Sequence, residues 1–167
     1  EERFVAAGIP YRLVGGVNFY QRREIKDILA YLKTIANAAD NLAVQRILNV
    51  PKRGIGAATV SAVSSFAAER DISFFEALRE APASGIAGRS SEKIQRFLNL
   101  IAAFRRESEK LSLSELIRLV LENSGYQEAL KEEGDLEAQA RMENIEELIS
   151  KAVDFERDLS DVSDRAE

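Results

Sequence analysis

Residues 49–59 read Asn-Val-Pro-Lys-Arg-Gly-Ile-Gly-Ala-Ala-Thr, and this stretch decides how the neighbouring chain folds. Pro51 ends a short helix that precedes it, because proline has no backbone N–H to continue a helical ladder. A new helix is expected over residues 57–69. The two glycines between them permit a tight turn, and the apolar Ile55 can pack between the two helices. The stretch therefore predicts an element like a helix-hairpin-helix.

The start of the second helix in this element is a candidate phosphate site. Backbone N–H groups near Gly56 and Ala57 open the helix, and a helix N-terminus attracts anions. Lys52 and Arg53 add positive charge beside it, and Thr59 offers a hydroxyl on the first turn. Such an element would grip DNA phosphates without reading bases. The alternative is an ordinary turn between helices that carries two exposed cations, and these residues alone leave both open.

A second glycine-containing segment, Gly85-Ile86-Ala87-Gly88-Arg89, also precedes an expected helix. Ser90 or Ser91 is the expected N-cap of that helix, with Lys93 and Arg96 nearby. A plain loop before a capped helix is the favoured interpretation, and a second phosphate-binding loop is the alternative. If both loops lie on one face, they would form a two-point phosphate clamp.

The rest of the chain favours an irregular, orthogonal multi-helix array that is mostly all-α. Apolar residues recur at helical spacing, and Gly and Pro are sparse, at 9 and 3 of 167 residues. One short strand is expected over residues 9–14, and a loop over residues 81–88. Helices are expected over residues 1–7, 24–36, 57–69, 90–110 and 126–132. Two short helices are expected as well, one capped by Asp40 that holds Leu42, Ile47 and Leu48 on its apolar positions, and one capped by Ser73. A helix capped by Ser112 is expected to end near Ser124, and the last helix is expected to run from Asp135, with Leu136 on its apolar face, to about Leu159, before a polar tail.

Composition excludes several classes of function. The chain has no Cys and no His, which removes thiolate chemistry, histidine-based zinc sites and Ser-His-Asp hydrolysis. It also lacks a Gly-x-x-x-x-Gly-Lys-Ser/Thr phosphate loop for ATP, so a freestanding enzyme finds no support. No apolar run is long enough to span a membrane, and no signal-peptide pattern opens the chain. We therefore expect a soluble, intracellular protein.

The net charge of −5 is distributed unevenly. Residues 1–70 carry 10 Lys and Arg against 6 Asp and Glu, whereas residues 111–167 carry 6 against 16. Any DNA-binding face is therefore expected in the first two thirds of the chain. The carboxylates of residues 111–167 are expected on solvated helix faces rather than in a metal or acid–base site. These acidic helices also carry the alternative function, a protein-interaction module that docks a partner protein or another copy of this chain.

A further segment, residues 15–24, follows the expected strand and reads Gly-Gly-Val-Asn-Phe-Tyr-Gln-Arg-Arg-Glu. Aromatic rings beside arginines can stack on single-stranded bases and neutralise phosphates. The alternative, which the segment alone favours, is that Phe19 and Tyr20 plug a junction between two domains.

Three segments of the sequence, called the sequence landmarks below, resemble motifs of one known family. Residues 15–27 resemble the Gly-Gly-x-x-Phe-Phe-x-Arg-x-Glu-Ile-Lys-Asp motif of superfamily 1 DNA helicases of the UvrD/PcrA/Rep group, with Tyr20 where that family often has Phe. Residues 49–56 look like the Gly-Ile-Gly segment of their subdomain 2B, and the intact Arg-Gly-Ile-Gly is nearer to UvrD and PcrA than to Rep. Residues 141–148 are similar to the Arg-x-Glu-Asn helix late in 2B.

The resemblance implies a domain organisation and a role. Residues 1–36 would be part of the RecA-like motor subdomain 2A, and residues 37–167 would be the helical subdomain 2B with a polar C-terminal tail. The family's whole enzyme is an ATP-dependent 3′-to-5′ DNA helicase of repair and replication, in which 2B swivels, contacts duplex DNA and regulates activity. ATP and Mg²⁺ would bind in the rest of the parent protein, with no cofactor in this fragment. The parent would be cytoplasmic and nucleoid-associated.

The resemblance also implies partners and contact residues. The partners would be double-stranded DNA, single/double-strand junctions and the remaining helicase subdomains, with no membrane. Carried over residue by residue, the duplex contacts would be Lys52, Arg53, Gly54, Ile55, Gly56 and Thr59, and the single-strand side of the motor would use Asn18, Phe19 and Arg22. A weaker secondary set, which rests on the second glycine-containing segment and not on the resemblance, is Gly85, Gly88, Arg89 and Lys93. A repair or transcription protein would be a further partner.

Overall fold

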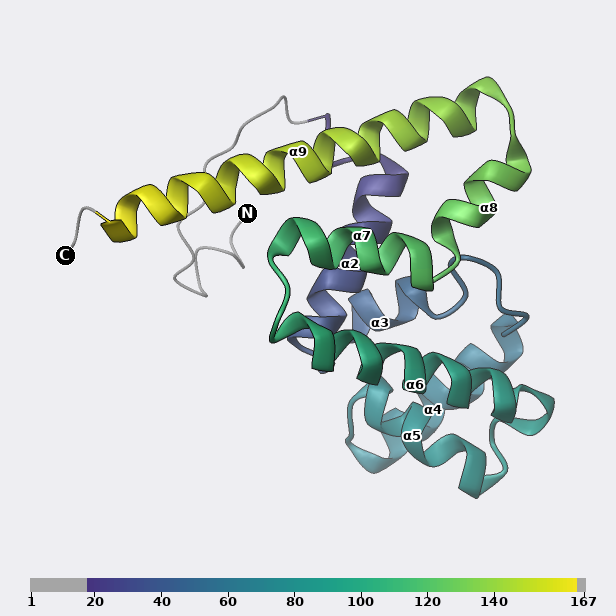
Figure 1. The fold of residues 1–167 in the computed structure, drawn as a ribbon. Helices are drawn as coiled ribbons and strands as arrows, with labels where there is room; N and C mark the ends of the chain where they lie inside the picture. The colour runs from purple at the N-terminus through teal and green to yellow at the C-terminus, as the bar shows by residue number, and fades with distance from the viewer. Residues whose placement is uncertain (1–17, 165–167) are drawn as a thin grey trace.

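The computed structural model describes residues 18–164, and these residues form an irregular array of helices (Figure 1). The helix expected over residues 1–7 and the strand expected over residues 9–14 lie outside the described residues. No β-strand occurs among residues 18–164, which confirms the mostly all-α prediction for this part of the chain. The elements are α2 (Arg23–Ala36), α3 (Asn41–Ile47), α4 (Ala57–Arg70), α5 (Phe74–Ser84), the 3₁₀ turn η1 (Gly88–Ser90), α6 (Ser91–Ser108), α7 (Leu113–Asn123), α8 (Tyr126–Glu133) and α9 (Leu136–Asp164).

Three helix starts carry the capping side chain expected from the sequence. The Asp40 carboxylate accepts from the Ala43 N–H at 3.2 Å and caps α3. Ser73 and Ser112 each form a reciprocal capping box with the glutamate three residues on, at the starts of α5 and α7. These caps satisfy N–H groups that would otherwise lack partners at the first turn of each helix.

Two apolar clusters share helices α2 and α7. The first lies among α2 to α7 and includes the buried rings of Tyr31, Phe97 and Phe104. The second lies among α2, α7, α8 and α9 and includes Ile28 and Ile145. In Figure 1, α9 runs along one side of the molecule and α4, α5 and α6 lie at the other, with α2 and α7 between them. Helix α2 therefore ties the two halves of the array together.

Two boundaries differ from the sequence prediction. The expected loop over residues 81–88 is wrong in its first half, because α5 continues to Ser84 with Pro82 inside its last turn. Burial of Ala81 in the first cluster holds this turn against the core. The polar tail expected after Leu159 is helical to Asp164, since solvated polar residues continue a helix that is already nucleated.

Two leucines that were expected on apolar faces are exposed. Leu42 is 73% exposed and Leu136 is 83% exposed. Both lie in the first turn of their helices, where the helical spacing places a residue on the apolar face but the neighbouring elements do not reach it. The distal part of α9 also extends beyond the body of the array, and it exposes Leu159 and Val162 (Figure 1).

Candidate nucleic-acid interface

The loop between α3 and α4 is a tight turn organised by one side chain. The Asn49 amide oxygen accepts from the Arg53 N–H at 2.7 Å and from the Ile55 N–H at 3.3 Å. Gly54 has φ +74°, a left-handed conformation that favours glycine. Ile55 is 1% exposed and packs into the first apolar cluster, as predicted. The residues around this turn, Lys52 to Gly56, are called the hairpin below.

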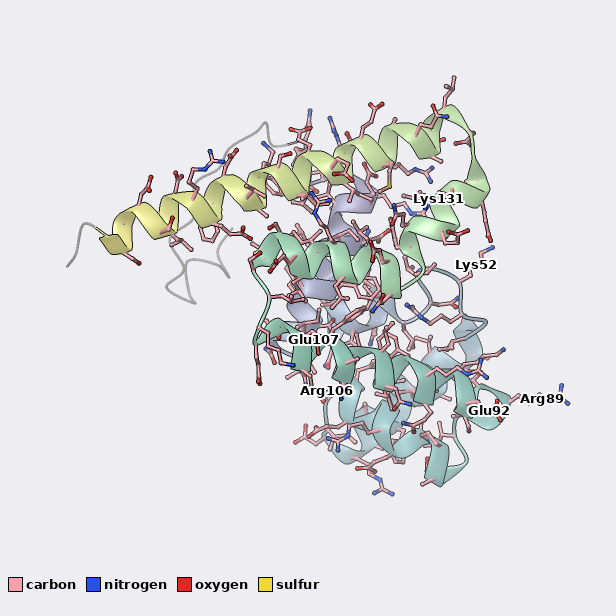
Figure 2. All side chains as sticks on the ribbon, viewed as in Figure 1. Lys52, Arg89, Glu92, Arg106, Glu107 and Lys131 are labelled. Carbon is pink, nitrogen blue, oxygen red and sulfur yellow. The ribbon has the colours of Figure 1, made fainter. Side chains whose placement is uncertain are left out.

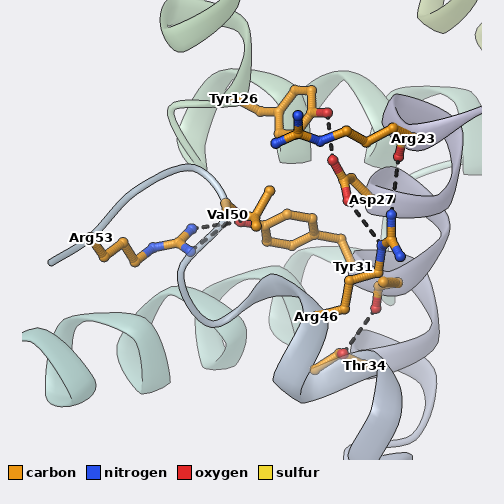
Figure 3. Close-up of polar contacts among 9 residues, drawn as sticks. Arg23, Asp27, Tyr31, Thr34, Arg46, Val50, Arg53 and Tyr126 are labelled. Carbon is orange, nitrogen blue, oxygen red and sulfur yellow. Dashed lines mark hydrogen bonds and ion pairs between the residues drawn. The ribbon is translucent and has the colours of Figure 1, made fainter. Parts of the chain in front are cut away.

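The guanidinium of Arg53 points into the molecule (Figure 3). It donates to the carbonyl oxygens of Ile47 at 2.7 Å, Leu48 at 3.2 Å and Val50 at 3.2 Å. Ile47 and Leu48 end α3, and a cation stabilises the carbonyl end of a helix. A fourth bond, 2.6 Å long, goes to the hydroxyl oxygen of Tyr31. Much of the hydrogen-bonding capacity of Arg53 is thus used within the fold.

The hairpin and the first turn of α4 lie against the start of α6. The Lys93 ammonium donates to the Gly54 carbonyl oxygen at 3.1 Å, across 39 residues of chain. The hydroxyls of Thr59 and Ser90 lie 3.2 Å apart. Ser90 stands at the N-cap position of α6, as expected, but its side chain makes no capping bond, because its hydroxyl pairs with Thr59. The Ser91 hydroxyl donates to the Gly88 carbonyl oxygen. The first turns of α4 and α6 therefore lie together beside the hairpin.

Two exposed cations, Lys52 and Arg89, lie on this side of the molecule, and the exposed carboxylate of Glu92 lies beside Arg89. Figure 2 shows Lys52 and Arg89 on the side where α6 begins, whereas Arg106 and Glu107 lie at the other end of α6. Both Lys52 and Arg89 are exposed, and neither forms an ion pair within residues 18–164. Gly85 and Gly88 both have positive φ and shape the loop that leads to Arg89. The surface thus combines solvated positive charge with two helix N-termini.

The second group of candidate residues lies at the start of α2. Phe19 is 5% exposed, with the Lys151 ammonium 5.2 Å and the Arg22 guanidinium 5.4 Å from its ring centre. Arg22 donates to the amide oxygen of Asn144, whose amide nitrogen donates to Glu24 at 2.6 Å. Asn18 is exposed. The structure thus joins the first and third sequence landmarks, and it does not bring Asn18, Phe19 and Arg22 to the hairpin.

A buried polar network crosses the middle of α2 (Figure 3). Asp27 is 2% exposed, and its carboxylate accepts from Arg46 Nε at 2.9 Å and from the Tyr126 hydroxyl at 2.8 Å. Burial, followed by the Asp27 charge, raises the pKa of Tyr126 far above its ordinary value. Burial also raises the pKa of Tyr31, against a smaller lowering by Arg53. Both hydroxyls therefore stay protonated at neutral pH and act as donors.

Sequence reasoning missed the side chains that hold the hairpin. Asn49 lies next to the glycine turn and Tyr31 lies on the apolar face of α2, where a phenol needs a partner for its hydroxyl. The need of the Tyr31 hydroxyl for a hydrogen-bond partner could have indicated this role, but the sequence did not identify the partner. The acidic residues were interpreted correctly, since Glu132, Glu146 and Glu147 are exposed. Among residues 18–164 no group of three or more acidic side chains is placed to hold a metal ion, and no helix is long and apolar enough to cross a membrane.

Comparison with known proteins identifies the family. The chain is 44% identical over 156 residues to the ATP-dependent DNA helicase PcrA of Staphylococcus aureus strain Mu50, which is 93% of this chain and 21% of that relative. It is 42% identical over 156 residues to PcrA of Staphylococcus epidermidis strain ATCC 35984, with the same coverage. The chain thus spans about a fifth of these relatives. The UvrD-like helicase C-terminal domain matches residues 1–165, and the chain belongs to that family.

Proposed function

We propose that this chain is the duplex-docking and regulatory part of an ATP-dependent 3′-to-5′ DNA helicase that acts in DNA repair and replication. Residues 37–167 would form subdomain 2B, and residues 1–36 would belong to the motor subdomain 2A. The main observation that supports this proposal is that the hairpin contacts the start of α6, through the 3.1 Å hydrogen bond from the Lys93 ammonium to the Gly54 carbonyl oxygen. The 44% identity to a PcrA helicase supports the same role.

The proposed docking surface binds backbone phosphates of duplex DNA. The first N–H groups of α4, beyond Gly56, would donate to one phosphate, and Lys52 and Arg89 would supply the positive charge. Lys93 and Thr59 would hold the two loops together, and the Gly85–Gly88 loop would add backbone contacts. Ile55 and Arg53 would act mainly by fixing the turn, since Ile55 is buried and Arg53 is bonded to internal carbonyls. Such contacts carry no base recognition, so binding would be independent of sequence.

The parent protein would supply the motor. Neither a phosphate loop in the sequence nor a metal-binding cluster among residues 18–164 is present to hold ATP or Mg²⁺ here. We assign both cofactors to parts of the helicase beyond this chain. Asn18, Phe19 and Arg22 would face the single-strand side of that motor, and the protein would act in the cytoplasm at the nucleoid.

The first experiment measures the fluorescence anisotropy of a labelled DNA stem-loop duplex and of a matched single strand of DNA. The protein and salt concentrations are varied. Two or three neutralised phosphates predict weak binding with a salt slope of about −2 to −3. Lys52→Glu should remove most of the duplex preference. Lys110→Glu is the matched control, because it makes the same charge change beyond the C-terminal end of α6, roughly 25 Å along that helix from Lys93.

A second pair of variants tests the helix N-terminus itself. Gly56 has φ −78°, and a Cβ added there would meet no atom within 4 Å, so Gly56→Asp and Gly56→Asn both fit. The two side chains are nearly equal in size and both cap helices well. Only the aspartate repels phosphate. Equal duplex affinity of the two variants would remove the start of α4 from the binding surface.

A protein-interaction role is the second candidate, and one observation favours it. The distal part of α9 exposes Leu159 and Val162 among carboxylates, in the segment that extends beyond the helical array. A repair or transcription protein with a basic, apolar surface would fit this segment. If neither duplex nor single strand binds at low salt and tens of micromolar protein, this role becomes the leading one.

A further inference from the structure

Tyr31 lies at the base of the hairpin, although it belongs to α2. Its side chain is fully buried, and its ring packs edge-on against Phe104 with 6.3 Å between the ring centres. Its hydroxyl donates to the carbonyl oxygen of Val50 and accepts from the Arg53 guanidinium at 2.6 Å. One phenol oxygen therefore contacts both the residue that enters the loop and the residue before Gly54 (Figure 3).

The Arg53 side chain is held by two aromatic rings and by four hydrogen-bond acceptors. Its guanidinium carbon lies 5.9 Å from the ring centre of Tyr31 and 5.4 Å from that of Phe97. The two hydrogens of its Nη1 are shared among three carbonyl oxygens, and its Nη2 donates to the phenol. Because the side chain is held, the backbone at Arg53 is held, and the Asn49 bonds then set the backbone at Ile55.

We infer that Tyr31 is a positioning residue for the duplex-docking surface, and that its hydroxyl holds the hairpin in the conformation that binds phosphate. This inference rests on the proposed function. It also gives α2 a mechanical role, because the same helix begins beside Arg22, roughly 13 Å away along its axis. A change in the environment of Arg22 would therefore reach the hairpin through one rigid element.

Tyr126 provides a matched control. It is also a buried tyrosine, its hydroxyl also donates to one oxygen of another element, and burial also raises its pKa. Its acceptor is Asp27, one turn before Tyr31 on α2, and no bond from it reaches the hairpin. Tyr31→Phe and Tyr126→Phe thus remove the same atom at two places along α2, one on the helix itself and one on α8, which packs beside it.

The experiment combines hydrogen exchange with duplex binding on the full chain. Tyr31→Phe should speed amide exchange at least fivefold in the peptide that covers residues 49–57, and it should weaken duplex affinity five- to tenfold. Tyr126→Phe should leave both quantities within twofold of the parent. A purely structural role for Tyr31 would instead raise exchange throughout α2 and α6 in step with the loss of thermal stability.

The outcomes separate this inference from the proposed function. If Lys52→Glu lowers duplex affinity and Tyr31→Phe changes neither exchange nor affinity, the positioning role is wrong and the docking surface stands. If Lys52→Glu has no effect, the docking surface is wrong. If Tyr31→Phe fails to fold, Arg53→Lys tests the same contact from its other end, because it keeps the charge and loses the fork. Unchanged exchange at residues 49–57 in that variant would overturn the inference.

Discussion

The Lys93 ammonium donates to the Gly54 carbonyl oxygen at 3.1 Å, and it also fills the space where a side chain on Gly54 would lie. A Cβ built on Gly54 would come within 2.7 Å of Lys93 Nζ. The glycine at this position therefore serves two purposes. It adopts the left-handed backbone of the turn, and it lets a cation from α6 approach the hairpin.

Gly54→Ala should weaken duplex binding as well as stability. The left-handed conformation with an alanine costs about 1–2 kcal/mol, and the added methyl displaces the Lys93 ammonium. Gly134→Ala is the control, since Gly134 has φ +63° at the end of α8 and a Cβ there makes only ordinary contact. Urea unfolding should show similar losses for both variants, while anisotropy should show weaker duplex binding only for Gly54→Ala. Unchanged affinity in both would separate Lys93 from the docking surface.

Asp27→Asn should be among the more destabilising polar substitutions in this chain. The carboxylate is buried, and its replacement leaves Arg46 and the Tyr126 hydroxyl with a poorer acceptor. Because the Arg46 side chain is 38% exposed and keeps part of its hydration, we expect a loss of about 2 kcal/mol rather than the full cost of a buried unpaired charge. Urea unfolding measures this loss. Glu92→Gln, in the exposed Glu92–Arg96 pair, should change little, and a similar loss there would contradict the prediction.

Asn144→Ala should loosen the junction between α9 and the start of α2. The amide bonds both Arg22 and Glu24, and Glu24 is 4% exposed, so its carboxylate would lose a buried donor. A loss of about 1–3 kcal/mol is expected by thermal or urea unfolding. Ser150→Ala is a control on the same helix, because the Ser150 hydroxyl bonds only the Glu146 carbonyl of its own helix. Equal stability of the two variants would mean that the Asn144 bonds contribute nothing net.

Stability should fall as the pH rises above 10. Burial raises the pKa of Tyr31 and Tyr126 above 10.0 in the folded protein, so the unfolded chain releases these protons first. The contribution is complete below pH 10 and is lost as the pH rises toward the folded pKa. For Tyr126 this amounts to about 1.4 kcal/mol between pH 9 and 11. Urea unfolding of the parent and Tyr126→Phe should differ by that amount in their pH dependence. Parallel curves would mean that Tyr126 ionises as freely in the fold as outside it.

Local signals predicted the helices of this chain well. Asp40, Ser73 and Ser112 cap the helices that their sequence positions indicated, because a capping bond reaches only three residues along the chain. The same local reasoning failed at Pro82, where a buried neighbour kept a proline inside the last turn of α5. It also failed at the end of α9, since a helix needs no apolar face to continue into solvent.

The boundary at residue 36 stays a prediction. Helix α2 packs into both apolar clusters, through Tyr31 on one side and Ile28 on the other. A helix on the motor side of that boundary would thus be embedded in the helical array, which makes α2 the natural path for any coupling between the two subdomains.

The sequence by itself determined the helices among residues 18–164 apart from some of their ends, the glycine turn, the burial of Ile55 and the family, since each rests on residues that lie close together within a segment of the chain. Only the tertiary structure decided what the charges do. Arg53 turns inward because carbonyls of α3 and the phenol of Tyr31 lie within reach, and Lys93 joins the hairpin across 39 residues. A long cationic side chain has many rotamers, and its partners are selected by whichever acceptors the packed helices bring near it.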